Sequence, residues 1–149
     1  MQLGDRVSDF TLNDNLGQSF TLSSALTKGP VVLFFYPAAM TKGCTKESCH
    51  FRDLGPAFDA LGAQRIGISM DDEATQARFA TQNQLDYPLL SDTGGLVAKQ
   101  FGVKRGLDLF KVRRATFVID VDGRILEAIR SELSMEVHAD RALEVLRAR

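Results

Sequence analysis

The chain contains two cysteines, Cys44 and Cys49, which lie five residues apart in the stretch YPAAMTKGCTKESCH. This spacing is wider than that of a C-x-x-C pair, and the residues around the two thiols favour a helix. Two thiols placed in this way fit three kinds of chemistry: buried packing, a metal site, or a redox pair that must deform its own helix to close.

Cys44 follows a predicted buried strand and a loop that runs from a proline to a glycine, so we expect it in the first turn of a helix. The unpaired N–H groups and the positive dipole end of a helix start favour an anion. A thiolate is such an anion, and it is the reactive form of cysteine. A small buried apolar residue is the commonest fate of a free cysteine, and the position alone leaves both interpretations open.

The position of Cys49 sets a geometric condition for a disulfide with Cys44. On an ideal helix, five residues correspond to about 7.5 Å of rise and about 140° of rotation, which places the two Cα atoms about 8.6 Å apart. A disulfide requires Cα atoms within about 7 Å. A bridge between the two cysteines therefore requires the first turns of the helix to unwind, which is plausible at a helix end because few hydrogen bonds are lost there.

A metal site fits the sequence poorly. Zinc would need at least two further soft or imidazole ligands, and the chain has only His50 and His138. His50 adjoins Cys49 and would point to another face of the helix, whereas His138 belongs to a distant C-terminal segment. We predict that no metal is bound and that both histidines are surface residues.

Length and composition indicate one soluble domain over residues 1–149, with 44% hydrophobic and 25% charged residues. The net charge of −1 favours neither nucleic acid nor a membrane as a partner. The sequence shows no charged-then-apolar leader and no long apolar run, so we expect a cytoplasmic protein. In that compartment a disulfide between the two thiols would be transient.

Apolar patterns and turn residues predict strands that alternate with helices. The expected strands are a hairpin within 7–26, then 29–37, 65–70, 87–92, 115–120, and a last strand that follows the Asp-Gly turn at 122–123. The expected helices are 45–61 with a kink or break at Pro56, then 71–84, 93–103 and 135–149. This order predicts βαβ units, with a central sheet covered by helices on both faces.

The segment FFYPAAMTKGCTKESCHFRD resembles the active-site segment of the peroxiredoxins, in which a proline, three residues, a threonine, two residues and a cysteine follow one another. Here these positions are Pro37, Thr41 and Cys44. A second cysteine five residues on resembles the bacterioferritin comigratory protein (Q-type) branch, and segments such as VVLFFYP, YPLLSD and RATFVID extend the resemblance over nearly the whole chain. The resemblance implies an α/β, thioredoxin-like fold: a central mixed sheet flanked by helices, with an N-terminal β-hairpin extension.

The resemblance also implies roles for the residues of the motif. Cys44 would be the peroxidatic cysteine, whose sulfur attacks the peroxide O–O bond and becomes a sulfenic acid. Thr41 would place its hydroxyl near that sulfur and the bound peroxide, and Pro37 would shield the pocket and fix the loop. Cys49 would be the resolving cysteine, which condenses with the sulfenic acid and releases water.

Two further positions match the family outside this motif. Arg114 would hold the thiolate and the peroxide, while strand alternation would aim its neighbour Arg113 the opposite way. Glu47 would help to orient that arginine, although an exposed helix carboxylate is an equally good interpretation. The chain departs from its relatives at Lys42, where proline is common, and at His50, where an acidic residue is common.

The resemblance implies a thiol peroxidase that reduces hydrogen peroxide or small organic hydroperoxides. Thioredoxin or a similar dithiol would reduce the Cys44–Cys49 disulfide, with no metal, haem or flavin. Relatives include monomers and dimers, so we expect a monomer or a weak homodimer. Three alternatives remain: a protein disulfide oxidoreductase, a redox sensor with little turnover, and a structural domain with incidental thiols.

Overall fold

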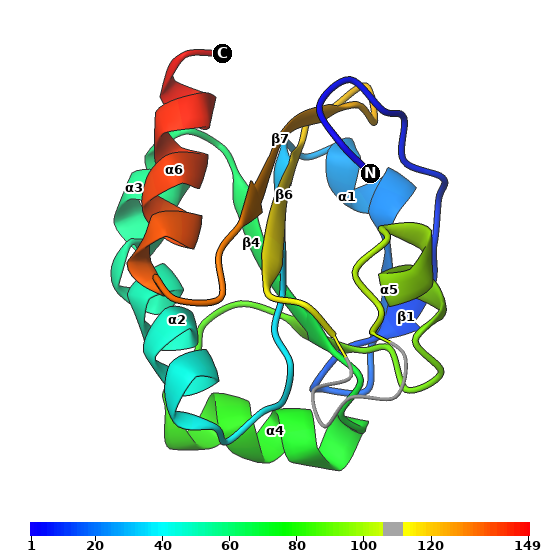
Figure 1. Ribbon diagram of the computed structural model, residues 1–149, viewed down its shortest axis with the longest axis vertical. Helices are drawn as coiled ribbons and strands as arrows, with labels where there is room; N and C mark the ends of the chain where they lie inside the picture. Colours follow the sequence, from blue (N-terminus) through cyan, green and yellow to red (C-terminus); the bar gives the residue numbers. More distant parts are fainter. Residues whose placement is uncertain (106–111) are drawn as a thin grey trace.

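The computed structural model describes residues 1–105 and 112–149, and within this part of the chain a five-stranded sheet lies between two layers of helices (Figure 1). In chain order the elements are β1 (Thr11–Asn13), β2 (Ser19–Thr21), α1 (Leu22–Leu26), β3 (Val31–Phe35), α2 (Lys42–Asp53), α3 (Gly55–Ala60), β4 (Gln64–Ser69), α4 (Glu73–Gln82), β5 (Leu89–Ser91), α5 (Leu96–Gln100), β6 (Ala115–Ile119), β7 (Ile125–Arg130) and α6 (Glu136–Arg147).

The strand order in the sheet is β5-β4-β3-β6-β7, and the sheet is mixed. β3 pairs in parallel with β4, and β4 in parallel with β5, whereas β6 is antiparallel to both of its neighbours. The central strand β3 pairs Leu33 with Ile66 on one side and with Phe117 on the other. The predicted α/β fold with a central mixed sheet is confirmed.

Two hydrophobic cores, one on each face of the sheet, follow from the alternation of β3. Val31, Leu33 and Phe35 belong to the core under α1, α5 and the N-terminal segment. Val32 and Phe34 belong to the core under α2, α3, α4 and α6. Figure 1 shows α2, α3 and α6 together on one side of the sheet, and α1 and α5 on the other. Because both faces are covered, β3 is apolar at every position.

The predicted N-terminal hairpin is present, since β1 and β2 pair antiparallel with Thr11 opposite Thr21. The hairpin predicted within 7–26 is shorter than that range, because β2 ends at Thr21 and Leu22 begins α1, where it is buried in the core. The helix predicted over 45–61 begins earlier, at Lys42, and is divided at Leu54 into α2 and α3. Pro56 lies in the first turn of α3, where its missing N–H costs no hydrogen bond.

Phe51 anchors α2 to the sheet, because its ring stacks on that of Phe34 with the centroids 4.1 Å apart and is fully buried. We expect Phe51→Ala to lower the free energy of unfolding by about 3–5 kcal/mol, since it leaves a cavity in the core. Urea unfolding measures this change. Leu133→Ala is the control and should be nearly neutral, because Leu133 is 96% exposed. Equal losses in the two variants would contradict this account of how α2 is held.

Candidate active site

Cys44 lies in the first turn of α2, as predicted, and its side chain is fully buried. The strand β3 ends at Phe35, and a six-residue loop separates it from the start of the helix at Lys42. Thr41 is the residue that precedes the helix, with an extended backbone. The sulfur therefore lies where the unpaired N–H groups of the helix start favour a negative charge.

The loop before α2 is closed by its own hydrogen bond. The Thr41 hydroxyl donates to the Ala38 carbonyl at 2.8 Å, and between them Met40 adopts a φ of 70°. A left-handed backbone is uncommon for a residue with a side chain, and such residues persist where the surrounding structure determines them. Pro37 is half-buried in the same loop. The expected roles of Thr41 and Pro37 toward peroxide remain predictions.

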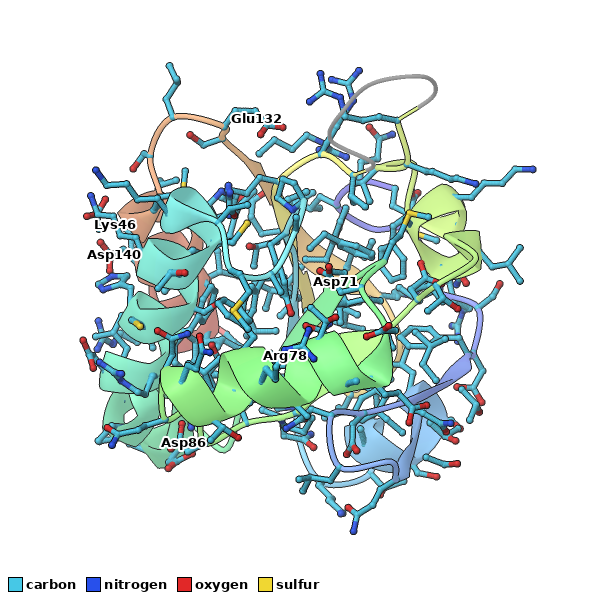
Figure 2. All side chains as sticks on the ribbon, turned by 90° about the horizontal axis from the view of Figure 1, so that it is seen from below. Lys46, Asp71, Arg78, Asp86, Glu132 and Asp140 are labelled. Atoms are coloured by element: carbon cyan, nitrogen blue, oxygen red, sulfur yellow. The ribbon has the colours of Figure 1, made fainter. Side chains whose placement is uncertain are left out.

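Asp71, which the sequence did not single out, also fixes this loop. It lies between the end of β4 and the start of α4 (Figure 2). Its Oδ2 accepts a hydrogen bond from the Ala39 N–H at 2.8 Å and another from the Ser69 hydroxyl at 2.7 Å. The loop that presents Thr41 is therefore attached to the neighbouring strand as well as to its own helix.

Arg114 connects the start of β6 to the thiol. Its Nη2 lies 3.2 Å from the Cys44 Sγ, and its Nη1 donates to the Glu47 Oε1 at 2.6 Å. Gly43 leaves room for this guanidinium, because a Cβ at this position would lie 3.3 Å from the Arg114 Nη2, which is a tight contact. Arg113 is exposed, in agreement with the alternation predicted for this pair.

Glu47 is fully buried, so the alternative of an exposed helix carboxylate is wrong. Loss of hydration raises the pKa of its carboxyl to about 8, although the Arg114 guanidinium opposes this rise. Burial alone would lower the pKa of Arg114, but Glu47 and Cys44 together raise it above its usual value. The guanidinium therefore stays charged between a thiol and a carboxyl group.

Cys49 is half-buried on α2, and its thiol lies 3.8 Å from the Asn83 Oδ1 at the end of α4. Both cysteines are free thiols and belong to one uninterrupted helix. This agrees with the expectation that an intact helix keeps the two sulfur atoms unbonded.

The comparisons with known proteins point to one family. A family model described as the AhpC/TSA family matches residues 3–128. A putative peroxiredoxin of Mycobacterium tuberculosis is 59% identical over 99% of this chain and 97% of its own length. The chloroplastic peroxiredoxin Q of Arabidopsis thaliana is 42% identical over 97% of this chain and 67% of its own. The crystal structure of the peroxidoxin BcpB from Mycobacterium tuberculosis superposes with a TM-score of 0.96, covering 99% of this chain and 97% of that one, at 59% identity.

The chain belongs to the AhpC/TSA family of peroxiredoxins. The predicted membership of the Q-type branch and the thioredoxin-like fold are confirmed. As a peroxiredoxin the protein is an oxidoreductase that reduces peroxide with a thiol.

The prediction that His138 is a surface residue was wrong, because this peroxiredoxin buries it completely. The reason is its place on α6, where His138, Ala142 and Leu146 follow one another at four-residue steps and face the sheet. Burial lowers the pKa of His138. The four-residue spacing of His138 with Ala142 and Leu146 puts it on the apolar face of the helix, and this pattern in the sequence indicates a buried side chain.

His50 is half-buried on α2 and reaches across to α6, where its Nε2 lies 2.8 Å from the Asp140 Oδ1. Figure 2 labels Asp140 and Lys46 on the outer side of these two helices. Residues 1–105 and 112–149 contain no group of three histidine, cysteine, aspartate or glutamate side chains placed to hold a metal ion. None of the helices in these two ranges is long and apolar enough to cross a membrane.

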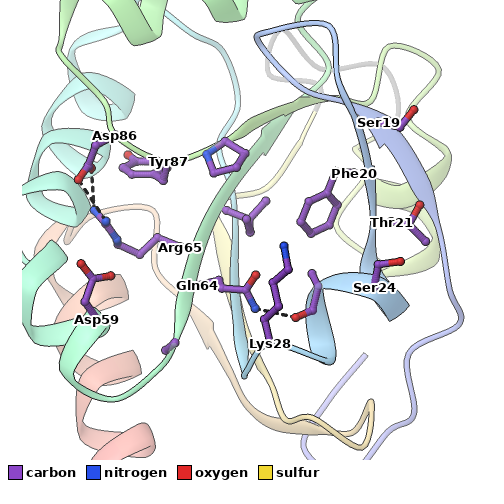
Figure 3. Close-up of a pocket in the computed structure, with 14 residues that line it drawn as sticks. Ser19, Phe20, Thr21, Ser24, Lys28, Asp59, Gln64, Arg65, Asp86 and Tyr87 are labelled. Carbon is purple, nitrogen blue, oxygen red and sulfur yellow. Dashed lines mark hydrogen bonds and ion pairs between the residues drawn. The ribbon is translucent and has the colours of Figure 1, made fainter.

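A cavity of ≈370 Å³ lies away from the thiol, between β2, α1 and the first residues of β4 (Figure 3). Arg65 on its wall pairs with Asp86 at 2.9 Å, and the Gln64 side chain donates to the Ala25 carbonyl at 2.8 Å. Cys44 does not line this cavity, so we place the chemistry at the start of α2 instead.

Glu47 makes stability depend on pH in a defined direction. The folded protein keeps the proton on this carboxyl up to about pH 8, whereas the unfolded chain loses it near pH 4.5. Between these values the unfolded state binds fewer protons, so this group makes the wild type less stable as the pH rises.

We expect the stability of the wild type to fall relative to that of Glu47→Gln, by up to roughly 1 kcal/mol for each pH unit between about pH 5 and pH 8. Urea unfolding of both proteins at several pH values measures the difference. Parallel profiles would show that Glu47 titrates normally in the folded state.

Proposed function

We propose that this peroxiredoxin reduces hydrogen peroxide and small organic hydroperoxides through a sulfenic acid on Cys44 and a Cys44–Cys49 disulfide. The observation that carries the proposal is the Arg114 guanidinium, 3.2 Å from a fully buried sulfur at a helix start. A cation and helix N–H groups together stabilise the thiolate, which is the nucleophile.

In the first step the Cys44 thiolate attacks one peroxide oxygen and the O–O bond breaks. Sulfur is oxidised to the sulfenic acid, the peroxide is reduced, and the leaving oxygen takes up a proton as water or an alcohol. Arg114 and the N–H groups at the start of α2 stabilise the negative charge that develops on the leaving oxygen. In this proposal Thr41 places its hydroxyl near the sulfur and the bound peroxide, and Pro37 shields them.

In the second step the Cys49 thiol loses its proton and its sulfur attacks the Cys44 sulfur, so that the S–S bond forms and the S–O bond of the sulfenic acid breaks; the leaving oxygen takes up the proton and departs as water. Since both residues lie in α2, the first turns of the helix must open for the sulfur atoms to meet. An external dithiol of the thioredoxin type then reduces the disulfide and restores both thiols. This cycle requires a reducing compartment, so we place the protein in the cytoplasm as one domain over residues 1–149. A monomer or a weak homodimer remains our expectation.

Treatment of the reduced protein with one equivalent of hydrogen peroxide tests the two roles of the cysteines. We expect mass spectrometry to find a Cys44–Cys49 disulfide in the wild type and a sulfenic acid on Cys44 in Cys49→Ser. Reaction of Cys49 in preference to Cys44 would reverse the assignment. Turnover that depends on peroxide also separates a peroxidase from a protein disulfide oxidoreductase and from a sensor with little turnover.

Arg114 and Arg113 form a matched pair of variants, because they are adjacent but only Arg114 contacts the sulfur. We expect Arg114→Ala to slow the reaction of Cys44 with peroxide by about 100-fold or more, since a buried donor to the transition state is lost. Arg113→Ala should change the rate by less than about twofold. Stopped-flow measurement of a single turnover compares them, and equal losses would refute the role of Arg114.

A further inference from the structure

We propose that His138 is a positioning residue for this reaction, which fixes the Glu47 carboxyl group and through it directs Arg114 to the Cys44 sulfur. The inference rests on the proposed function of Cys44, and it extends the site by one buried imidazole. His138 touches neither the sulfur nor the peroxide in this proposal, so its effect must pass through Glu47.

A row of neighbouring buried groups supports the proposal. Arg114 lies between the Cys44 sulfur at 3.2 Å and the Glu47 Oε1 at 2.6 Å. The other oxygen of the same carboxyl, Oε2, lies 3.7 Å from the His138 Nδ1. Within the described part of the chain, this Oε2 is a buried oxygen without a hydrogen-bond partner. It is therefore the atom of Glu47 that His138 is placed to influence.

Hydrogen bonds fix the protonation of the imidazole. The His138 Nε2 lies 2.9 Å from the Ser131 carbonyl, which can only accept, so this nitrogen carries the hydrogen. The Nδ1 lies 2.8 Å from the Thr116 hydroxyl. In the neutral ring this nitrogen is an acceptor, and the hydroxyl donates to it. The Nδ1 lone pair is therefore taken by the Thr116 hydroxyl, and the ring offers no hydrogen to the Glu47 Oε2, 3.7 Å away.

A carboxylate oxygen beside this nitrogen would meet a partial negative charge and no donor, whereas an uncharged carboxyl group avoids that cost. The neutral imidazole therefore favours the uncharged form of Glu47. Burial acts in the same direction, because it raises the pKa of Glu47 and lowers the pKa of His138. The guanidinium of Arg114 then faces the Cys44 sulfur with no carboxylate on Glu47 to compete for it.

The charged groups around His138 come from several elements. Arg114 precedes β6 and opposes a positive charge on the imidazole, whereas Glu132 follows β7 and favours one. The Glu132 carboxylate also accepts the Arg114 backbone N–H at 3.1 Å. Glu47 and Cys44 face the site from α2. Burial outweighs the influence of Glu132, since the pKa of His138 is lowered.

Two isosteric changes separate positioning from simple support of the fold. In His138→Asn the side-chain amide occupies the place of Nδ1, next to Thr116 and Glu47. In His138→Gln the amide occupies the place of Nε2, next to the Ser131 carbonyl. We expect the asparagine variant to keep the wild-type rate of peroxide reaction within about threefold, and His138→Gln and His138→Leu to lose at least about tenfold.

Single-turnover stopped flow at pH 7 measures the peroxide rate. The pH profile of Cys44 alkylation, recorded in a Cys49→Ser background so that one thiol reports, gives a second measurement that needs no peroxide. We expect the midpoint of this profile to move to higher pH in the glutamine and leucine variants, because an ionised Glu47 then competes for Arg114. His50→Leu is the matched control and should change neither measurement.

A double-variant comparison tests whether His138 acts through Glu47. In a Glu47→Gln background, where the side chain is uncharged at every pH, His138→Leu should cause no further loss of rate. The same tenfold loss in both backgrounds would overturn the proposal, as would equal rates in His138→Asn and His138→Gln. If His138→Leu does not fold, the comparison of His138→Asn with His138→Gln tests the proposal. If Cys44 of the wild type is alkylated normally but does not react with peroxide, the proposed function is refuted. The alkylation profiles of the His138 variants would still test whether His138 positions Arg114.

Discussion

The contact between the Arg114 guanidinium and the Cys44 sulfur is the interaction on which the rest of the site depends. The two residues are brought together by the register of the central strands, in which Phe35 at the end of β3 is paired with Ala115 at the start of β6. The loop that leads to α2 begins where β3 ends, which is next to Arg114, the residue before β6. A slip of one residue in this antiparallel pair would turn Arg114 to the other face, as the exposed Arg113 shows. The geometry of the candidate site is therefore a consequence of sheet register.

This arrangement is costly for stability. A guanidinium, a carboxyl and a thiol are buried together, and the desolvation of such groups often exceeds the attraction between them. The structure lowers the cost in two ways: the carboxyl favours its uncharged form, and the arginine donates to both neighbours. In the described ranges, the Arg114 Nε and the Glu47 Oε2 still lack a hydrogen-bond partner. A core chosen for stability alone would hold apolar residues here, which supports a chemical reason for these groups.

Local pattern was sufficient to predict most of the framework, and tertiary packing decided the rest. The apolar run of β3, the Pro37–Thr41–Cys44 spacing and the alternation at Arg114 are all visible in the sequence. The burial of His138 was missed because a single polar residue was judged by its type and not by its four-residue spacing with Ala142. The bond from Asp71 to the Ala39 N–H joins two loops 32 residues apart, and no local pattern encodes it. Glu47 was ambiguous for the same reason, since its burial depends on α6 and β6 closing over α2.

In the proposed cycle, helix α2 must keep the two thiols apart before peroxide reacts and must open afterwards so that they can meet. The charge of the Cys44 sulfur differs between these two stages. In the proposed cycle, a thiolate on Cys44 is held by Arg114 and by the N–H groups of the first turn, and it stabilises that turn in return. Once Cys44 becomes a neutral sulfenic acid, the charge-assisted part of this interaction is lost. The turn then opens more easily, at the moment when Cys49 must approach. Lys42 is the first residue of α2 and is exposed, at a position where proline would preset the backbone. In this proposed cycle, the reaction with peroxide therefore weakens the interactions that keep the two thiols apart.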